Sequence, residues 1–313
     1  MEALLLSAQH LVRRFGRFEA VRGVSFEAGE GEVLGLLGQN GAGKTTVMNM
    51  LAGFLAPTSG QVLVAGKDAA LAPLEARRRV GYLPEIPPVY PELTVKESLD
   101  FVSELRGVVP ADRKRHAADL MDLAGLTDVR DQTARSLSKG YRQRLGFAQA
   151  LCGNPDILLL DEPTGGFDPV QAAAFHRLIG KLARGKLIIL SSHLLTQVQA
   201  VCTRALILRD GRLVSDVKLD ARQAAVRFLV AVDAPAARVL SPIRNLPTVR
   251  RAKVVSGGDA NVTRLEVDAS AGFERALFTL LSALQAPLLE LTPLRDTLEE
   301  AFFRAYAGEG EAN

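Results

Sequence analysis

The segment Gly38–Thr45 constrains the fold of this chain more than any other part, because it reads GQNGAGKT and matches the pattern G-x-x-x-x-G-K-[ST]. The apolar run VLGLL precedes it and the apolar run VMNML follows it, so the local order is strand, glycine loop, helix. Glycines let consecutive backbone amides turn inward and hold phosphate oxygens at a helix N-terminus. The Lys44 ammonium is expected to reach the β- and γ-phosphates of a nucleotide, and the Thr45 hydroxyl can ligate Mg²⁺. The flanking strand and helix argue against a plain glycine turn with a surface lysine.

A second apolar run, ILLL at 157–160, ends in two acidic residues, Asp161 and Glu162. A continuous apolar run of this length suits a parallel strand that is buried on both faces. Ligands of parallel sheets bind at the carboxyl ends of the strands, so both carboxylates are expected beside the glycine loop. Asp161 suits the Mg²⁺ shell and Glu162 is placed to polarise a water molecule. Without the glycine loop, a solvated turn after a strand would explain this pair equally well.

Alternating strands and helices around the glycine loop predict an α/β fold with crossover connections. The first part, with strands at 4–12 and 18–28, reads as a β-rich lobe. From Thr94 to about residue 125 the periodicity is helical, and Thr94 and Glu97 have the spacing of a capping box. Further predicted elements are strands at 61–65 and 80–83, a helix from Ser138 to about 152, a helix opened by Asp168 and Pro169, the strand KLIILSSH and the helix LLTQVQAVC.

The pattern changes after a boundary somewhere in 214–225. The order of elements there is βαββαβ with a final helix, which is the ferredoxin-like pattern, and Asp296 and Glu299 have capping spacing. We therefore expect a small α+β domain. The predicted elements are a strand at 226–232, a helix at 234–246, strands at 249–256 and 262–268, a helix at 273–285, a strand at 287–292 and a helix at 296–307.

Composition excludes several classes of protein. Lys+Arg 38 against Asp+Glu 35 gives a net charge of +3, too close to neutral to indicate a nucleic-acid partner. Two cysteines cannot form a disulfide framework, and reduced thiols in the cytosol are the simpler expectation. No apolar run approaches the roughly 18–20 residues of a membrane span, and the N-terminus lacks the features of a signal peptide. If the protein acts at a membrane, another chain is expected to hold it there.

Three further motifs lie between and after these elements: LSKGY at 137–141, PTGGFDP at 163–169, and Ser192-His193 at a strand end. With the glycine loop and the acidic pair, they make residues 3–215 resemble the nucleotide-binding subunit of an ABC transporter, in the branch that energises ABC-2-type permeases. The resemblance implies the ABC-ATPase version of the P-loop fold, with a β-rich lobe, a parallel sheet core and a helical subdomain at about 86–135. It implies an ABC ATP-binding domain at 1–215 and an accessory domain at 216–313.

The resemblance also implies the role of each matching residue. Phe15 would stack on adenine, and Asp168 would help to join two subunits. Glu162 would be the general base and His193 the switch histidine that contacts the γ-phosphate, although His193 taken alone is more simply a buried structural histidine. Ser138 and Gly140 would contact the γ-phosphate bound to a second copy of the chain. The residues implied in ATP and Mg²⁺ binding are Gly38, Asn40, Gly41, Gly43, Lys44, Thr45 and Thr46, with Asp161 also at the metal.

Three positions depart from the family pattern. Glu85 stands where the family usually has Gln, and a carboxylate can accept from water or bind the metal but cannot donate to phosphate. LSKGY replaces the common LSGGQ, which places a cation at Lys139 and removes an amide at Tyr141. GGFD replaces SGLD before Pro169. We interpret these changes as marks of a subtype, with Glu85 still counted among the residues at the nucleotide.

The function implied is ATP hydrolysis that drives a separate ABC-2-type transmembrane permease, with export inferred from the resemblance. The active form would be a homodimer with ATP at its interface, cytoplasmic and held at the inner face of the cell membrane by the permease. Two other functions remain open. One is a soluble ABC ATPase that acts on a non-transport complex such as the ribosome or DNA, although such proteins generally have tandem nucleotide domains or long coiled coils. The other is a C-terminal ligand-sensing module that gates the ATPase.

Overall fold

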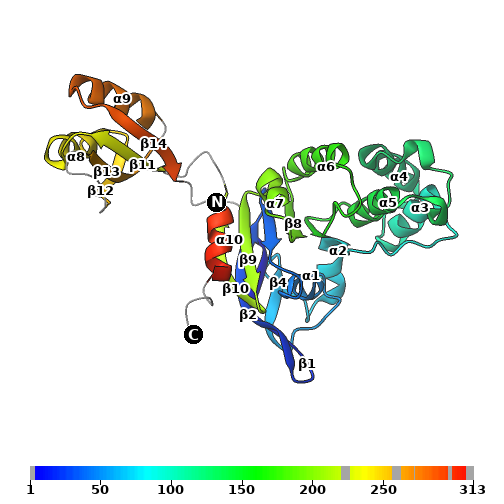
Figure 1. The fold of residues 1–313 in the computed structure, drawn as a ribbon. Helices are drawn as coiled ribbons and strands as arrows, with labels where there is room; N and C mark the ends of the chain where they lie inside the picture. Colours follow the sequence, from blue (N-terminus) through cyan, green and yellow to red (C-terminus); the bar gives the residue numbers. More distant parts are fainter. Residues whose placement is uncertain (1–3, 220–225, 256–261, 271, 295–297, 308–313) are drawn as a thin grey trace. The chain divides into compact units, whose positions relative to one another are not determined.

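The computed structural model describes residues 4–219, 226–255, 262–270, 272–294 and 298–307. They form two compact units (Figure 1). The first ends at Leu219 and includes the chain again from Arg304 on, and the second is Asp220–Phe303. In the described ranges, no helix combines the length and the apolar character that a membrane span requires. The assignment of functional domains to 1–215 and 216–313 stays a prediction.

The first unit begins with an antiparallel sheet, in the part of the chain where the sequence predicts strands and a β-rich lobe. Its two long strands pair along their length and end at the partners Phe15 and Phe18, where Gly16 takes a φ of +59° in the turn between them. The strand order is β2-β1-β4-β5. The bounds are β1 (Leu4–Phe15), β2 (Phe18–Gly29), β4 (Ser59–Val64) and β5 (Lys67–Asp68).

The second sheet of this unit is the predicted parallel core. Its strand order is β10-β9-β3-β8-β7-β6, and only the β9–β10 pair is antiparallel. Every residue of β3, β7 and β8 is buried, which explains why these strands read as continuous apolar runs rather than alternating ones. The bounds are β3 (Val33–Leu37), β6 (Val80–Leu83), β7 (Ile157–Asp161), β8 (Leu187–Ser192), β9 (Arg204–Arg209) and β10 (Arg212–Lys218).

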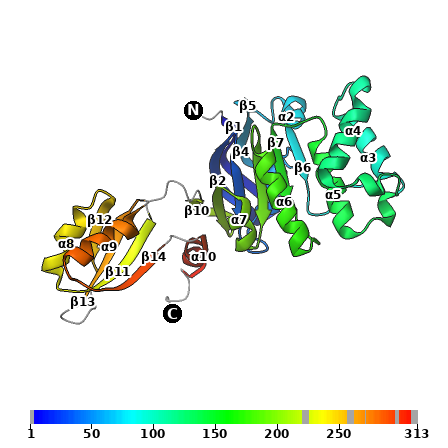
Figure 2. The same cartoon turned by 90° about the horizontal axis from the view of Figure 1, so that it is seen from above.

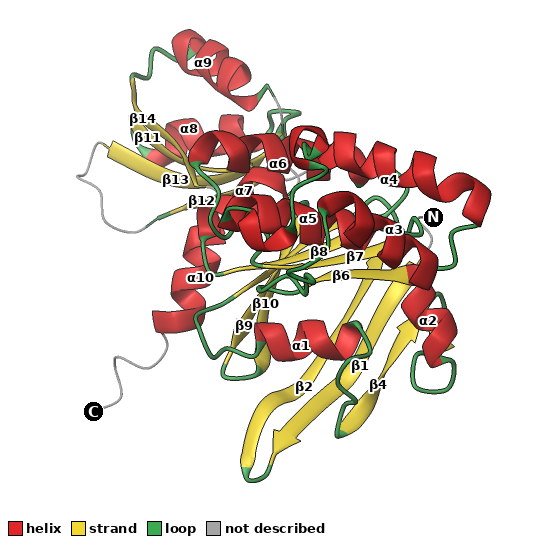
Figure 3. Cartoon of the chain, turned by 90° about the vertical axis from the view of Figure 1, so that its right-hand side faces the viewer, coloured by secondary structure: helices red, strands yellow, loops and turns green. Residues whose placement is uncertain are grey.

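Helix α1 (Lys44–Leu51) lies between the two sheets and contacts β1 and β2 on one side and β7 and β8 on the other (Figure 3). Helices α6 (Pro169–Leu182) and α7 (Leu195–Val201) lie on the opposite face of the six-stranded sheet. Helix α7 packs closely, because a Cβ at Gly35 in β3 would lie 2.5 Å from a methyl of Val198. Helix α1, which follows the glycine loop, is therefore held in the middle of a three-layer unit.

The helical part of the first unit begins after β6. The predicted capping box is confirmed, since the Thr94 hydroxyl accepts from the Glu97 amide and the Glu97 carboxylate accepts from the Thr94 amide. The single helical stretch expected to about residue 125 is two helices, because Gly107 takes a φ of +77° and Pro110 starts a new first turn. Figure 2 shows α3 and α4 beyond α5 from the sheet. The bounds are α2 (Pro73–Arg79), α3 (Val95–Leu105), α4 (Pro110–Ala124) and α5 (Lys139–Leu151), with 3₁₀ turns at Thr127–Val129 and Ala134–Ser136.

Helix α5 joins this helical part to the sheet through an unusually close contact. A Cβ at Gly146 would lie 2.5 Å from the Pro87 Cβ and 2.8 Å from a methyl of Leu83. The backbone of α5 at Gly146 therefore packs directly against the side chains of Leu83, at the end of β6, and Pro87, two residues after Glu85.

The second unit contains an antiparallel sheet with the strand order β12-β13-β11-β14. Its core is formed by strand residues such as Phe228 and helix residues such as Phe273, whose ring centroids are 4.9 Å apart. The predicted element order is confirmed, although the first helix begins later and ends earlier than expected. The predicted cap at Asp296 lies outside the described residues. The bounds are β11 (Val226–Asp233), α8 (Ala236–Arg244), β12 (Val249–Val254), β13 (Val262–Ala269), α9 (Phe273–Ala283) and β14 (Leu288–Leu294). Helix α10 (Leu298–Ala307) belongs to the second unit up to Phe303 and to the first unit from Arg304.

Candidate nucleotide site

The glycine loop connects β3 to α1, as predicted, and glycine is needed at its positions for two separate physical reasons. Gly41 and Gly43 take φ values of +83° and +102°, in the region that side chains with a Cβ rarely adopt. Gly38 has no room for a Cβ, because that atom would lie 2.4 Å from the Leu208 carbonyl oxygen. Asn40 and Thr45 are exposed and Thr46 is half-buried, so the polar side chains of the loop remain accessible to a ligand.

Lys44 is only 7% exposed, yet it lies among polar groups. Its ammonium donates to the carbonyl oxygens of Gly38 (2.7 Å) and Gln39 (3.1 Å), so the lysine closes the loop on itself. Burial lowers the pKa of Lys44, and the negative charges of Glu162, Asp161 and Glu85 oppose that shift. The three carboxylates that the sequence assigned to this site are therefore close enough to act on one ammonium.

Asp161 ends β7 and is 1% exposed. One carboxylate oxygen, Oδ1, accepts a hydrogen bond from the hydroxyl of Ser191 on the neighbouring strand β8. The same Ser191 hydroxyl accepts from the backbone amide of Glu162 at 3.0 Å. Ser191, which the sequence analysis did not select, thus positions both acidic residues. Its only signal in the sequence is that it is the last but one residue of a strand, directly before Ser192-His193.

Glu162 and His193 are in direct contact. His193 Nδ1 lies 2.8 Å from Glu162 Oε1, and the two side chains are 49% and 20% exposed. Glu162 takes a φ of +47°, a strained backbone conformation for a residue with a Cβ. The strain turns the chain directly after β7, and the neighbouring strand end β8 supplies the histidine. The structure therefore brings together two residues that are 31 positions apart in the sequence.

Ser138 and Asp168 each cap a helix, as predicted. The Ser138 hydroxyl accepts from the Tyr141 amide at 3.3 Å at the start of α5, and the Asp168 carboxylate accepts from the Gln171 amide at 2.8 Å at the start of α6. A Cβ at Gly140 would make only ordinary contacts, the nearest at 3.5 Å. The packing of this chain therefore does not itself demand a glycine at position 140.

Tyr141 and Phe167, two residues that depart from the family pattern, both lie near Arg144. The Arg144 guanidinium lies 5.7 Å from the ring centroid of Tyr141 and 5.8 Å from that of Phe167. Phe167 also packs against Phe175, with ring centroids 5.6 Å apart. Tyr141 and Phe167 therefore belong to one small cluster, which gives their joint occurrence a physical basis.

Phe15 lies at the tip of the β1–β2 hairpin and is 48% exposed. The Arg13 guanidinium covers its ring at 4.7 Å, which is a cation–π contact. Phe18, its partner across the hairpin, is 62% exposed. The hairpin thus presents aromatic surface that can accept a planar base.

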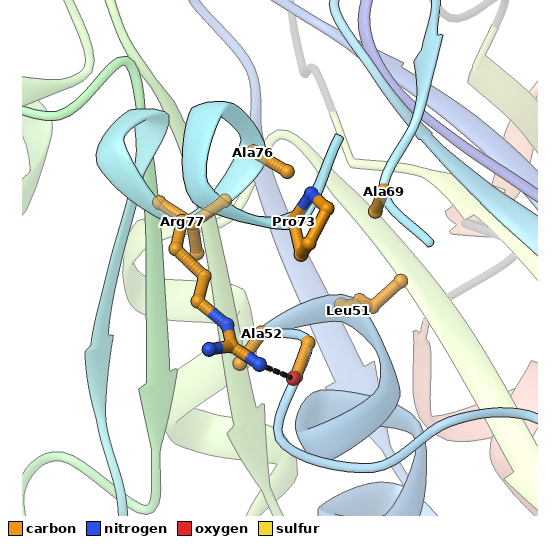
Figure 4. A pocket seen from close by; sticks show the side chains of 8 residues that line it. Leu51, Ala52, Ala69, Pro73, Ala76 and Arg77 are labelled. Carbon is orange, nitrogen blue, oxygen red and sulfur yellow. Dashed lines mark hydrogen bonds between the residues drawn. The ribbon is translucent and has the colours of Figure 1, made fainter. Parts of the chain in front are cut away.

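A small cavity lies elsewhere, between the end of α1 and α2, and Arg77 donates across it to the Gly53 carbonyl oxygen at 3.0 Å (Figure 4). None of the residues assigned to the nucleotide lines it, and most of its lining is apolar. It is lined by Leu51, Ala52, Gly53, Ala69, Pro73, Ala76, Arg77 and Val80.

The donor set of the site fits a magnesium ion that is shared with a nucleotide. Oδ2 of Asp161 is buried and has no hydrogen-bond partner in the structure, which is costly for a carboxylate unless a cation or water completes it. The described residues contain no group of three or more His, Cys, Asp or Glu side chains that could hold a metal ion without a nucleotide. Mg²⁺ commonly takes one or two protein ligands and completes its octahedron with phosphate and water oxygens.

The site combines a glycine loop before a helix, a lysine inside the loop and an acidic pair at the end of β7, which lies two strands from β3 in the sheet. These features define a P-loop nucleotide-hydrolysing protein. Residues 21–165 match the family model for the ABC transporter. The chain is 37% identical over 214 residues to the lipopolysaccharide export system ATP-binding protein LptB of Acidithiobacillus ferridurans, covering 67% of this chain and 89% of that protein. The chain belongs to the family of ABC transporter ATP-binding proteins, and it is an ATPase.

Other comparisons agree with this assignment. The chain is 35% identical over 217 residues to the Nod factor export ATP-binding protein I of Burkholderia orbicola (strain AU 1054), covering 69% of this chain and 71% of that protein. A solved ATP-binding subunit of an ABC transporter superimposes with a TM-score of 0.64 at 29% identity, over 69% of this chain and 90% of the other. A dimeric ATP-binding cassette solved with ADP and Pi has a TM-score of 0.65 at 24% identity, over 69% and 100% of the two chains, which supports the fold alone.

Proposed function

We propose that this protein binds ATP with the Gly38–Thr46 loop, hydrolyses it with Glu162 and His193, and uses the energy to drive a separate transmembrane permease. The observation that carries the site assignment is the glycine loop closed around the buried Lys44 ammonium, with the carboxylates of Glu162, Asp161 and Glu85 near enough to act on its charge. These charges can position a nucleotide, a metal ion and a water molecule at one point. Phosphoryl transfer to water requires this kind of positioning and charge neutralisation more than covalent chemistry.

In the proposed reaction, the Lys44 ammonium leaves the carbonyl oxygens of Gly38 and Gln39 and binds the β- and γ-phosphates. Glu162 orients the attacking water and accepts its proton as the water oxygen bonds to the γ-phosphorus. His193, already in contact with Glu162, holds that carboxylate in place and contacts the γ-phosphate. The bond to the β-phosphate oxygen breaks, and ADP and phosphate leave. Phe15, with Arg13 across its ring, stacks on the adenine.

Thr45 and Asp161 would hold Mg²⁺, the latter through its unpartnered Oδ2. The ion supplies charge neutralisation for the phosphate oxygens. Glu85 is exposed on the segment after β6 and acts on Lys44 electrostatically, so we assign it to the water or the metal rather than to a phosphate.

We assign Ser138 and Gly140 to the ATP that is bound by a second copy of the chain. The N-terminus of α5 carries a partial positive charge and free amides that suit a γ-phosphate. The absence of an intramolecular packing reason for Gly140 supports a role outside its own subunit. Asp168, one helix start away, would help to join the two copies.

The permease is proposed to be of the ABC-2 type and the direction of transport to be export. The names of two relatives, a lipopolysaccharide export ATP-binding protein and a Nod factor export ATP-binding protein, support export. The permease would hold the protein at the inner face of the cell membrane. For the second unit we propose a ferredoxin-like accessory domain, which the strand order β12-β13-β11-β14 and the two intervening helices support.

The shared site can be tested with two defective variants. Lys44→Ala and Ser138→Arg should each be inactive as homodimers, the first because the phosphate cation is lost and the second because a bulky side chain blocks the interface. In their heterodimer both lesions fall in one site and the other site is intact, so a mixture should regain turnover. The double variant mixed with wild type has one lesion in each site and is the matched control. A mixture that neither dimerises with ATP nor regains activity, while wild type does both, contradicts the shared-site model.

The transport role can be tested by expressing the chain with and without the permease encoded by a neighbouring reading frame. We expect it to sediment with membranes only when the permease is present, and to retain ATPase activity there. Sedimentation with ribosomes or nucleoid instead would favour the soluble ABC ATPase.

A further inference from the structure

The last turn of α10 contacts the phosphate loop, although it is far from that loop in the sequence. The backbone amide of Gln39 donates to the Tyr306 hydroxyl at 3.0 Å, and the Tyr306 hydroxyl donates to the Leu208 carbonyl oxygen at 2.8 Å. All three residues belong to the first compact unit. One phenol oxygen therefore connects the loop to strand β9.

This bridge lies where the pairing of two core strands ends. The last partners of β3 and β9 are Leu37 and Ile207, and the bridged groups follow within two residues. Next to the bridge, Gly38 lies so close to the Leu208 carbonyl that no Cβ would fit. The phenol thus extends the connection between β3 and β9 beyond their last paired residues, at the entrance of the loop.

The bridge acts on a residue that already holds the phosphate-binding lysine. The carbonyl oxygen of Gln39 accepts from the Lys44 ammonium at 3.1 Å, while its amide donates to Tyr306. Both backbone polar groups of Gln39 therefore have partners: the carbonyl oxygen accepts from Lys44, and the amide donates to Tyr306 in α10. A change at the phenol would alter the orientation of the peptide groups around Lys44.

The position of Tyr306 is itself supported by β9. Arg209 donates to the Ala305 carbonyl oxygen at 2.6 Å, and its guanidinium lies 5.7 Å from the Tyr306 ring centroid. A cation at the last carbonyls of a helix is favourable because of the partial negative charge there. These contacts hold the ring independently of its hydroxyl, so the hydroxyl can be removed without removing the support.

We propose that Tyr306 is a positioning residue of the nucleotide site, whose hydroxyl fixes the backbone at the entrance of the phosphate loop, so that less of the loop must be ordered when the Lys44 ammonium moves to ATP. It does not touch the reacting atoms. A preorganised loop binds more tightly because less conformational freedom is lost on binding. The proposal rests on the proposed use of the Gly38–Thr46 loop for phosphate, and it adds a C-terminal residue to that site.

The test is Tyr306→Phe, which removes the hydroxyl and keeps the ring beside Arg209. For the loss of one bridging hydroxyl we expect the Kd for a non-hydrolysable ATP analogue and the KM for ATP to rise roughly 3- to 10-fold. The value of kcat should stay within about twofold, because no group at the reacting atoms changes. Tyr90→Phe is the matched control, since Tyr90 is an exposed tyrosine of the helical part, and it should leave both constants unchanged.

Binding and positioning are reciprocal, so ATP should in turn stabilise the contact. In the wild-type protein, hydrogen exchange of the backbone amides at 304–307 should slow when the ATP analogue is bound. This measurement does not depend on the folding of any variant.

An unchanged or lower Kd in Tyr306→Phe overturns the proposal, as does a fall in kcat with KM unchanged, or exchange at 304–307 that does not respond to the analogue. Lys44→Ala separates this outcome from failure of the site itself. If Lys44→Ala binds the analogue with wild-type Kd, the loop is not the phosphate site. If only Lys44→Ala loses affinity, the loop is the site and Tyr306 has no part in it.

Discussion

At the scale of single residues, Ser191 determines how the two acidic residues act together. Its hydroxyl donates to the Asp161 carboxylate and accepts from the Glu162 amide, so the carboxylate assigned to the metal and the backbone of the assigned base share one atom. Glu162 is held there in spite of its positive φ. A residue that is neither base nor ligand therefore sets the relative position of both.

Replacing Ser191 by Ala should change metal dependence as well as stability. The substitution leaves a buried Asp161 oxygen and the Glu162 amide unsatisfied, which costs about 1–3 kcal/mol of unfolding free energy. We also expect a severalfold higher Mg²⁺ concentration for half-maximal ATPase activity. Ser192→Ala is the matched control, because Ser192 is equally buried but bonds only to Leu194 and Gln197. Equal Mg²⁺ dependence in the two variants would contradict this role for Ser191.

Glu162→Gln should slow hydrolysis by about 10²–10⁴ while ATP binding is retained, because an amide cannot accept the proton of water. The variant should accumulate as an ATP-bound dimer, which size-exclusion chromatography with ATP would detect. Glu85→Gln is the comparison, since the charge of Glu85 also acts on Lys44. If Glu162→Gln hydrolyses ATP at the wild-type rate and Glu85→Gln does not, the base is Glu85.

Motif residues could be selected from the sequence because their spacing is local. The glycine loop, the acidic pair and the helix caps at Ser138 and Asp168 each depend on neighbours within a few positions. Ser191 and Tyr306 could not be selected, since their roles depend on which strands become neighbours and on which way a side chain points. The role of His193 at the γ-phosphate was implied only by a family resemblance, and its contact with Glu162 was not predicted.

At the scale of elements, most helices and strands follow from apolar periodicity and capping residues, whereas their interruptions do not. The capping box at Thr94 was predicted correctly. The break between α3 and α4 was not, because it depends on one glycine with positive φ inside a stretch of continuous helical periodicity. Strands β9 and β10 were also missed. Their assignment required the pairing of β9 with β3 across the core.

Two glycines in helices should respond in opposite ways to the same change. Gly180→Ala in α6 meets nothing within 4 Å, so it should raise the unfolding free energy by about 0.5–1 kcal/mol through helix propensity. Gly146→Ala in α5 gains the same propensity but places a Cβ 2.5 Å from Pro87. The resulting displacement should lower the unfolding free energy by about 1–3 kcal/mol. Denaturant unfolding of both variants checks the pair, and stabilisation by Gly146→Ala would show that α5 does not press on this segment.

At the scale of the whole molecule, all the residues that we assign to the nucleotide lie in the first compact unit. Each unit has its own apolar core. The order of elements in the second unit was predicted from alternating periodicity alone. What that unit binds could not be predicted, because no motif in it carries a recognisable chemistry.

A chain that ends at Leu219 should still fold and bind ATP, because it keeps the loop, the acidic pair and His193. Since it also lacks Tyr306, its Kd for ATP should be raised by the same roughly 3- to 10-fold as in Tyr306→Phe. Titration with a fluorescent nucleotide would compare this chain, the full chain and the full chain with Tyr306→Phe. A shortened chain that folds but binds no nucleotide, while the full chain with Tyr306→Phe still binds, would show that residues after Leu219 contribute to the site beyond the Tyr306 hydroxyl.

The close contact between Gly146 and Pro87 determines whether two movements at the site occur together or one after the other. A helix rises about 1.5 Å per residue, so the start of α5 at Ser138 is roughly 12 Å from this contact along one rigid rod. Because Gly146 has no side chain of its own and the ring of Pro87 is rigid, a shift of Pro87 displaces the helix backbone directly. We therefore expect two movements to occur at the same time. Ser138 withdraws from the partner's phosphate as the Glu85 carboxylate is displaced, and neither movement takes place without the other.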